Sequence, residues 1–250
     1  MMIGKRGRAV TSVSTADADG LTVRGRDLCG DLMGRLSFTE YFYLLMTGRE
    51  PTADQRYFLD LLLVAIAEHG LVPTNVAARM TLAADPASLQ GAVAAGILGC
   101  GSVILGASQY CGEFLVAAQA APDLRAHVQA IKDSGGKVPG FGHPLHKVAD
   151  PRSTRINQLL KERGSAGRHV ATANATVPIV ARVWGKALPM NVSMMIAAVL
   201  LDLDFPSSML KAIPILARTA GLLAHLAEEQ VTPIGFVMAN AAEQAVAYEP

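Results

Sequence analysis

The sequence is poor in charge and in aromatic side chains. Only 17% of its 250 residues are charged, 5% are aromatic, and the formal net charge is +1. A chain this close to neutral, without a run of lysine or arginine, produces no electrostatic field that would hold nucleic acid or an anionic lipid surface. We therefore expect neither nucleic acid nor a membrane among its partners.

Cysteine is also scarce. The three cysteines, Cys29, Cys100 and Cys111, are an odd number, and their spacing fits neither a disulfide framework nor a metal site. Residues 1–11 are basic but lack the apolar run of a signal peptide. Both observations favour a reducing compartment, so we expect the protein to be cytoplasmic.

One stretch has no charge at all, between Asp85 and Glu113. It contains repeated glycines together with serine and glutamine, which a lipid-facing helix would expose at a cost. Small residues suit helices that pack backbone to backbone inside a protein. We therefore expect a buried helix close to a subunit interface.

Helix signals follow one another along most of the chain, which is rich in alanine and methionine. Ser37 and Glu40 form a capping-box pattern before a helix that ends at Gly48, and Thr52 repeats the pattern. The helix that opens at Thr52 is expected to run through residue 59 to residue 68. Further helices are expected at 73–83, 86–100, 105–120, 124–132, 151–162, 169–184, 191–201 and 209–229, the last with a kink at Pro214. Residues 21–35 and 230–250 are expected to add one helical turn each at most. No two-residue period is sustained enough for a sheet, so the predicted fold class is all-α.

Chemistry is concentrated in residues 139–152, which read PGFGHPLHKVADPR. Proline and glycine prevent a helix before His143, so this histidine is expected on a loop shaped around a ligand. Asp150 is a good N-cap for a helix that starts at Pro151, and Arg152 then lies in the first turn. A cation there is favourable when it shares an anion with the free N–H groups. A histidine and an arginine facing one anionic ligand fit the pattern as well as a surface turn with a solvated arginine.

Gly-Phe-Gly-His at 140–143, followed by Asp-Pro-Arg at 150–152, resembles the signature of the citrate synthase superfamily, which includes citrate synthases, methylcitrate synthases and citryl-CoA lyases. The resemblance implies that the loop before the histidine wraps coenzyme A. His143 would hold the hydroxyl or carbonyl at the carbon being joined or cleaved, and Arg152 would bind a substrate carboxylate. The implied CoA-binding residues are Gly140, Phe141, Gly142 and Lys147.

The resemblance extends to residues 23–27, 37–48, 67–70 and 217–225. It implies that Arg218 binds a second substrate carboxylate and that His69 lines the same pocket. It also implies a citrate synthase-like fold and a homodimer. The large helical domain would comprise residues 1–105 and 191–250, and the inserted small domain, residues 106–190, would carry the CoA and substrate loop.

Two residues depart from the family pattern. Ser193 follows Asn191-Val192, where citrate synthases have a catalytic aspartate, and a serine hydroxyl is a poor base unless another group activates it. Ile104 takes the place of the electrophilic histidine and donates no hydrogen bond. His146, three residues after His143 and with an ordinary pKa near neutrality, is the best substitute for the missing proton-transfer group.

These residues lead us to expect a carbon–carbon lyase of the citryl-CoA lyase type, which cleaves a citryl-CoA-like thioester to acetyl-CoA and an oxo acid. The CoA thioester is the substrate or product, and no permanently bound cofactor is expected. Two alternatives stay open. One is a condensing enzyme, a transferase like citrate or methylcitrate synthase, acting on another acyl-CoA. The other is a non-catalytic homologue that binds CoA or a dicarboxylate.

Three readings carry less weight. His143 and His146 have a spacing that suits metal, but two ligands without a third make a weak case, so no metal site is predicted. His225, on an apolar helix face, is expected to be a packing histidine. A helical module that only mediates assembly gives no reason for Arg152 and Arg218 to converge.

Overall fold

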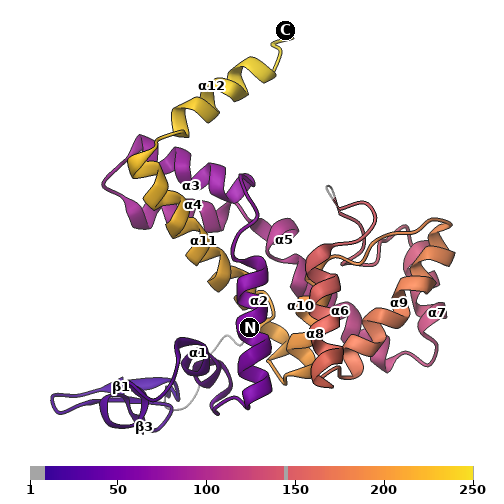
Figure 1. The fold of residues 1–250 in the computed structure, drawn as a ribbon, viewed down its shortest axis with the longest axis horizontal. Helices are drawn as coiled ribbons and strands as arrows, with labels where there is room; N and C mark the ends of the chain where they lie inside the picture. Colours follow the sequence, from indigo (N-terminus) through magenta and orange to yellow (C-terminus); the bar gives the residue numbers. More distant parts are fainter. Residues whose placement is uncertain (1–8, 144–145, 250) are drawn as a thin grey trace. The chain divides into compact units, whose positions relative to one another are not determined.

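The computed structural model describes residues 9–143 and 146–249 of the chain (Figure 1). Pro144 and Leu145 of the central motif, and most of the basic N-terminal stretch, lie outside the described residues. The chain divides into two compact units, Met1–Asp60 and Leu61–Pro250. The large domain and inserted small domain expected from the family resemblance stay a prediction.

The first unit contains a small sheet that the sequence did not predict. Its strands β1 (Ser14–Ala16), β2 (Leu21–Val23) and β3 (Arg26–Asp27) are antiparallel and lie in the order β1-β2-β3. The turn between β2 and β3 has positive φ at Arg24 and Gly25. Strands of two or three residues are too short to show a two-residue period, which is why no sequence signal pointed to them.

The helices of the first unit follow the predicted capping signals. A short π-helix, η1 (Leu28–Leu32), precedes α1 (Phe38–Thr47). Ser37 accepts the Glu40 N–H, and the Glu40 carboxylate accepts the Ser37 N–H, so the capping box is confirmed. Gly48 ends α1 at φ +80°. The helix α2 (Ala53–Ala67) follows, with Thr52 and Gln55 exchanging hydrogen bonds at its start.

The second unit is built from helices, and the all-α fold class is confirmed. Its elements after α2 are α3 (Pro73–Ala84), α4 (Leu89–Leu98), α5 (Gly101–Ile104), α6 (Ala107–Ala120), α7 (Leu124–Asp133), α8 (Pro151–Arg163), α9 (Arg168–Trp184), α10 (Val192–Asp202), η2 (Ser207–Met209), α11 (Ala212–Val231) and α12 (Gly235–Ala245). Pro214 lies in the first turn of α11, where a missing N–H costs least, so it marks the start of the helix and not a kink within it.

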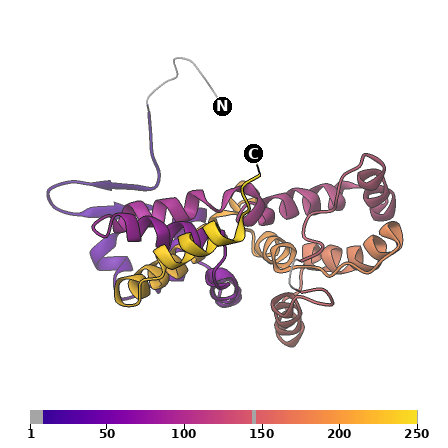
Figure 2. The ribbon, with the colours of Figure 1, turned by 90° about the horizontal axis from the view of Figure 1, so that it is seen from above.

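Two groups of helices make the core of this unit. Figures 1 and 2 both draw α11 beside α3 and α4, and a buried cluster joins the three. The members of this cluster are Ala78, Leu82, Ala92, Leu222 and Leu226. In the other group α10 packs against α6, α8 and α9, and its residues 194–200 are all buried. An apolar helix surrounded by others has no polar face to give it an amphipathic period, which explains its continuous run of apolar residues.

The uncharged segment between Asp85 and Glu113 forms three helices instead of one long one. Gly101 has a φ of +53° and separates α4 from α5. Ala92 is buried as expected, but Leu98 and Val103 are 81% and 86% exposed in the single chain. The expectation of a buried helix therefore holds for parts of the segment, such as Ala92 in α4 and Ser108 and Cys111 in α6, and the homodimer stays a prediction.

The C-terminal segment differs from the expected tail with one turn, because α12 runs over Gly235–Ala245. Its start is capped from the preceding helix, where the Glu229 carboxylate accepts the N–H groups of Ile234 and Gly235. A cap that comes from α11 satisfies orphan N–H groups without any capping signal next to α12 in the sequence.

One segment, Ser207–Val231, is long and apolar enough to cross a membrane by length and composition. Core helices of soluble proteins meet the same criterion. Here Leu222 and Leu226 of α11 are packed inside the second unit. The segment is therefore weak evidence for a membrane.

We predict that Asp202→Ala destabilises the fold by about 1–3 kcal/mol. The Asp202 carboxylate, at the end of α10, accepts the N–H groups of His169 (2.9 Å) and Val170 (3.0 Å) and so caps the start of α9. Urea unfolding of the full chain measures the change. The control is Asp133→Ala, whose carboxylate accepts one exposed bond from Gln129, with an expected change within about 0.5 kcal/mol. An equal change in both variants would contradict the capping role.

Candidate active site

A cavity of about 630 Å³ in the second unit brings together residues that lie far apart in the sequence. Its lining includes His69, His143, Arg152, Ser193 and Arg218. Ile104, at the end of α5, also lines this cavity. The two arginines and two of the histidines that the sequence singled out therefore share one pocket with both residues that depart from the family pattern.

The loop before His143 is held by backbone pairing with the segment before α10. The Gly142 N–H donates to Pro189, the Asn191 N–H donates to the Gly140 carbonyl, and the Asn191 side chain donates to the Gly142 carbonyl. Gly140 has a φ of +79°, and a Cβ there would lie 2.7 Å from Cβ of Met194. Only glycine meets both conditions, so the glycines serve to seat the loop against α10.

Asp150 joins the starts of two helices behind the pocket. Its buried carboxylate caps α8 by accepting the Arg152 N–H, binds the Arg152 guanidinium at 3.1 and 2.9 Å, and accepts the N–H of Val192, the first residue of α10. Burial raises the pKa of Asp150, but these bonds outweigh burial and hold the pKa below its usual value. The predicted N-cap is confirmed, and Arg152 is fixed at the pocket wall by its own neighbour.

His143 carries a defined tautomer. Its Nδ1 accepts the N–H of His146 at 3.1 Å, so in the neutral ring the proton is on Nε2. Burial lowers the pKa of His143, and the nearby His146 lowers it further, so the neutral ring is favoured near neutral pH. A neutral imidazole with Nε2–H is a hydrogen-bond donor suited to a hydroxyl or carbonyl oxygen.

Arg218, on α11, is a buried cation whose hydrogen-bonding groups the described residues satisfy only in part. The residue is 2% exposed, and its Nη2 makes one long bond to the Ile66 carbonyl at 3.4 Å. Its Nε and Nη1 have no acceptor among the described residues. A buried guanidinium without a carboxylate is costly, so this side chain is suited to bind an anion that enters the pocket.

The other residues singled out from the sequence lie around this core. Ser193 is in the first turn of α10, and its N–H is capped by the Asn191 side chain. Lys147 is directed back to its own loop, donating to the His143 carbonyl at 3.3 Å. Phe141 lines a separate pocket of about 210 Å³ with Trp184 and Lys186. The CoA-binding roles of Gly140, Phe141, Gly142 and Lys147 stay predictions.

Three histidines form a cluster at the pocket. The rings of His143 and His146 stack with their centroids 4.4 Å apart, and the His69 ring lies 5.8 and 6.4 Å from them. One ring nitrogen from each lies within 4.8 Å of the others. The sequence supplied the pair of His143 and His146, and the fold adds His69 from the segment before α3.

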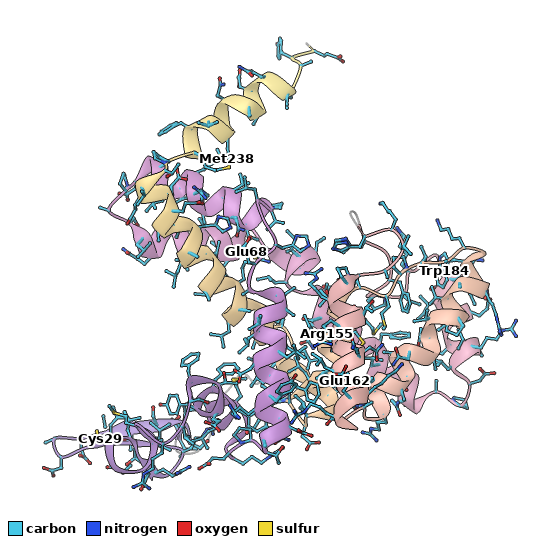
Figure 3. The ribbon with its side chains drawn as sticks, in the orientation of Figure 1. Cys29, Glu68, Arg155, Glu162, Trp184 and Met238 are labelled. Carbon is cyan, nitrogen blue, oxygen red and sulfur yellow. The ribbon has the colours of Figure 1, made fainter. Side chains whose placement is uncertain are left out.

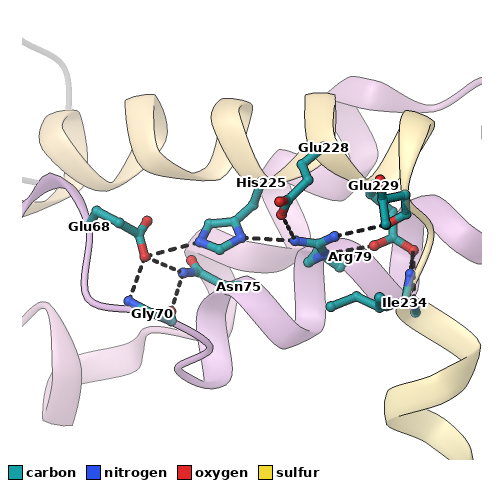
Figure 4. Close-up of polar contacts among 10 residues, drawn as sticks. Glu68, Gly70, Asn75, Arg79, His225, Glu228, Glu229 and Ile234 are labelled. Carbon is teal, nitrogen blue, oxygen red and sulfur yellow. Dashed lines mark hydrogen bonds and ion pairs between the residues drawn. The ribbon is translucent and has the colours of Figure 1, made fainter.

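A charged network that the sequence did not predict supports the turn carrying His69 (Figure 4). Glu68, which Figure 3 places between α2 and α3, accepts the N–H groups of His69 and Gly70. It also bonds the Asn75 side chain and Nε2 of His225. His225 is therefore a largely buried histidine that also serves as a polar link, a role that the sequence did not predict.

Arg79 completes this network from α3. Its guanidinium, 2% exposed, binds Glu229 and Glu228 at 2.6 Å each and lies 3.2 Å from Nδ1 of His225. An arginine only donates, so Nδ1 accepts and the ring proton of His225 points at Glu68. The result is a chain of bonds from the end of α11 to the His69 turn. No sequence signal pointed to this network, because its glutamates on α11 and its arginine on α3 lie far apart in the chain.

Known proteins resemble this chain over most of its length. The family model described as citrate synthase, C-terminal domain, matches residues 23–234. The Bacillus subtilis citrate/2-methylcitrate synthase is 28% identical over 197 residues, which cover 78% of this chain and 53% of that protein. The chain spans about half the length of the curated relatives it matches.

Two solved structures have the same fold. Citryl-CoA lyase from Hydrogenobacter thermophilus superposes with a TM-score of 0.89 at 30% identity, over 97% of this chain and 94% of that one. A mutant Methanosaeta concilii ATP citrate lyase in complex with (3S)-citryl-CoA has a TM-score of 0.81 at 19% identity, over 99% of this chain and 42% of that one.

We predict that Glu229→Gln destabilises the protein by about 3 kcal/mol, because it leaves the buried Arg79 without its buried carboxylate. Glu228→Gln is the matched control. Glu228 binds the same guanidinium, but its side chain is 63% exposed, and we expect a loss of about 1 kcal/mol or less. Chemical denaturation measures both. Equal losses of stability in the two variants would mean that burial does not determine how much these ion pairs contribute to the free energy of unfolding.

We also predict a pH signature for Asp150. Because its folded-state pKa is lowered, the stability it contributes is present above the usual value of 3.8 and is lost as the pH falls through the folded-state pKa. Asp150→Asn should therefore be less stable than the parent at neutral pH. The difference in free energy of unfolding between the two proteins should become smaller below pH 3.8. Urea midpoints across this range test it. A gap that widens on acidification would contradict the assignment.

Proposed function

Because the chain belongs to the citrate synthase family, we propose that it is a carbon–carbon lyase of the citryl-CoA lyase type, cleaving a citryl-CoA-like thioester to acetyl-CoA and an oxo acid. Its substrates and products in this proposal are an acyl-CoA and a di- or tricarboxylic acid. The Hydrogenobacter citryl-CoA lyase, similar over nearly the whole of both chains, is the reason for favouring cleavage over condensation.

The observation that carries the proposal is the buried guanidinium of Arg218, two of whose nitrogens have no acceptor among the described residues. Its Nε and Nη1 require an anion, and the cavity beside it is lined by Arg152 and His143. A substrate with two carboxylates and a central hydroxyl matches two guanidinium groups and one imidazole donor in one pocket. A neutral ligand would leave the charge of Arg218 uncompensated.

The proposed roles follow from these donors. Arg218 and Arg152 bind carboxylates of the substrate, and His143 donates its Nε2–H to the oxygen on the carbon where the bond breaks. In cleavage this hydroxyl loses its proton and becomes the oxo group. The electron pair of the broken carbon–carbon bond passes to the carbon next to the thioester as an enolate, which takes up a proton to give acetyl-CoA. No oxidant or reductant is needed.

Proton transfer and enolate stabilisation need groups other than Ser193 and Ile104. A serine hydroxyl at neutral pH is a poor base, and isoleucine donates nothing. We assign proton transfer to a member of the histidine cluster instead. His146, which lies beside His69 and His143, is our candidate. We place coenzyme A along the loop of Gly140, Phe141 and Gly142, with Lys147 near its phosphates, and we propose a cytoplasmic homodimer.

The same two departures support a second candidate function. Loss of a catalytic carboxylate commonly removes several orders of magnitude of rate, each tenfold corresponding to about 1.4 kcal/mol of barrier. Ser193 and Ile104 therefore favour, as the alternative, a homologue that binds CoA and a dicarboxylate without turning them over. The pocket and its arginines serve both candidates.

The test is incubation of the purified chain with citryl-CoA, with mass-spectrometric detection of acetyl-CoA and oxaloacetate. We expect turnover in the parent and a loss of about a hundredfold or more in His143→Ala, Arg152→Ala and Arg218→Met. His127→Ala, whose ring lies against Phe114 on a different helix pair, is the control and should keep parental activity. Calorimetry with CoA and citrate separates the candidates, since binding without turnover supports the non-catalytic homologue.

A further inference from the structure

We propose that His69 is the general base that removes the proton of the substrate hydroxyl as the carbon–carbon bond breaks. The proposal rests on the lyase function above and divides its two proton transfers. His69 takes the hydroxyl proton, and protonation of the enolate remains the step assigned to His146. This role goes beyond the pocket-lining position that the family resemblance implies for His69.

The first argument is the set of side chains around the cavity. No aspartate or glutamate is among the described residues that line it. The two arginines of the lining are cations, and the Ser193 hydroxyl is a poor base. The titratable side chains that remain in the lining are His69 and His143. A base supplied by the cavity wall is therefore one of these two imidazoles.

The second argument is what the nitrogens of the two imidazoles already do. Nδ1 of His143 accepts the N–H of His146 at 3.1 Å, so its Nε2–H is a donor and the ring has no second acceptor nitrogen. The His69 ring contacts the rings of His143 and His146 but forms no hydrogen bond within residues 9–143 and 146–249. A neutral His69 therefore keeps one lone pair for a proton. His143 donates to the substrate oxygen, and His69 accepts from it.

The third argument is the spacing of the two rings, which fits one hydroxyl between them. Their centroids lie 5.8 Å apart, and a nitrogen of His69 lies within 4.8 Å of a nitrogen of His143. A hydroxyl that accepts one hydrogen bond and donates another spans up to about 5.6 Å, since each bond is about 2.8 Å long. A single substrate hydroxyl can therefore contact both rings.

The fourth argument is the rigid backbone that presents His69 (Figure 4). The Glu68 carboxylate accepts the N–H of His69 at 2.9 Å and that of Gly70 at 2.6 Å. The same carboxylate is bonded to His225 of α11 at 3.0 Å. A base whose turn is already fixed loses little freedom when the hydroxyl arrives, which favours proton transfer.

The charges facing His69 are compatible with its becoming a cation. Arg152 and Arg218 line the same cavity, and the substrate carboxylates compensate them when bound. Burial raises the pKa of Glu68, but bonds from His225 and from the N–H groups of His69 and Gly70 outweigh it and hold that pKa below its usual value. An ionised carboxylate is thus joined to the backbone of His69 at neutral pH.

In the proposed step the O–H bond of the substrate breaks, and its electron pair forms the oxo group. The electron pair of the carbon–carbon bond passes to the enolate. His69 holds the hydroxyl proton and releases it to water, while the enolate takes up one proton to give acetyl-CoA. Protons therefore balance over the reaction, and no oxidant or reductant is needed.

The test compares citryl-CoA cleavage by the parent, His69→Gln and His69→Ala. Glutamine forms hydrogen bonds but takes up no proton, so we expect kcat to fall about a hundredfold or more in both variants, with KM within about threefold of the parent value. Imidazole added to the buffer should raise the rate of His69→Ala by about tenfold or more, because it supplies the missing base. His127→Ala is the control and should keep the parental rate with or without imidazole.

A pH profile distinguishes a base from a residue that only shapes the pocket. Imidazoles titrate between about pH 5 and 8, so protonation of the base should lower kcat/KM on the acid side in the parent. That acid limb should be lost in His69→Gln. Burial lowers the pKa of His143 below its usual value, so His143 remains neutral over most of this range.

Two results would overturn the base and leave the lyase in place. One is parental kcat in His69→Gln, and the other is a lower rate that imidazole does not restore and whose pH profile is unchanged. Circular dichroism and calorimetry with citrate establish that the variants fold and bind. No cleavage by the parent would overturn both the lyase and the base.

Discussion

The pocket depends on a single carboxylate that is shared between two helix starts. Asp150 accepts N–H groups from Arg152 at the start of α8 and from Val192 at the start of α10, and it binds the Arg152 guanidinium as well. Asn191 then ties the start of α10 to Gly142 of the loop. The loop, α8 and α10 are therefore fixed to one another, and His143, Arg152 and Ser193 are held on one wall of the cavity.

Two arginines in the second unit are equally buried and differ in what surrounds them. Arg79 has two glutamates, a backbone carbonyl and a histidine nitrogen as partners, so its charge is balanced inside the fold. Arg218 has one distant carbonyl and two nitrogens without an acceptor among the described residues. The same side chain is structural in one place and unsatisfied in the other. The difference is the reason for proposing that the substrate anion binds at Arg218 and not at Arg79.

The network around Arg79 also reaches the site. Through His225 and Glu68 it holds the backbone on both sides of His69, and Glu229 at its other end caps α12. The histidine that completes the cluster of three is thus presented by a turn whose hydrogen bonds come from α3 and α11. The charged groups that hold α3 against α11 therefore also help to position His69.

The sequence by itself determined the all-α class, the capping of α1 and α8 and the loop before His143, whereas the binding roles of Arg152 and Arg218 stay predictions. Each of these depends on residues within about four positions, or on a local motif, so the information is present in a short window. It failed where the partner is distant: the strands of two or three residues, the cap of α12 by Glu229 and the polar role of His225. Only the tertiary structure brought His69 to His143 and His146 and left two nitrogens of Arg218 without an acceptor among the described residues, because both depend on which helices pack together.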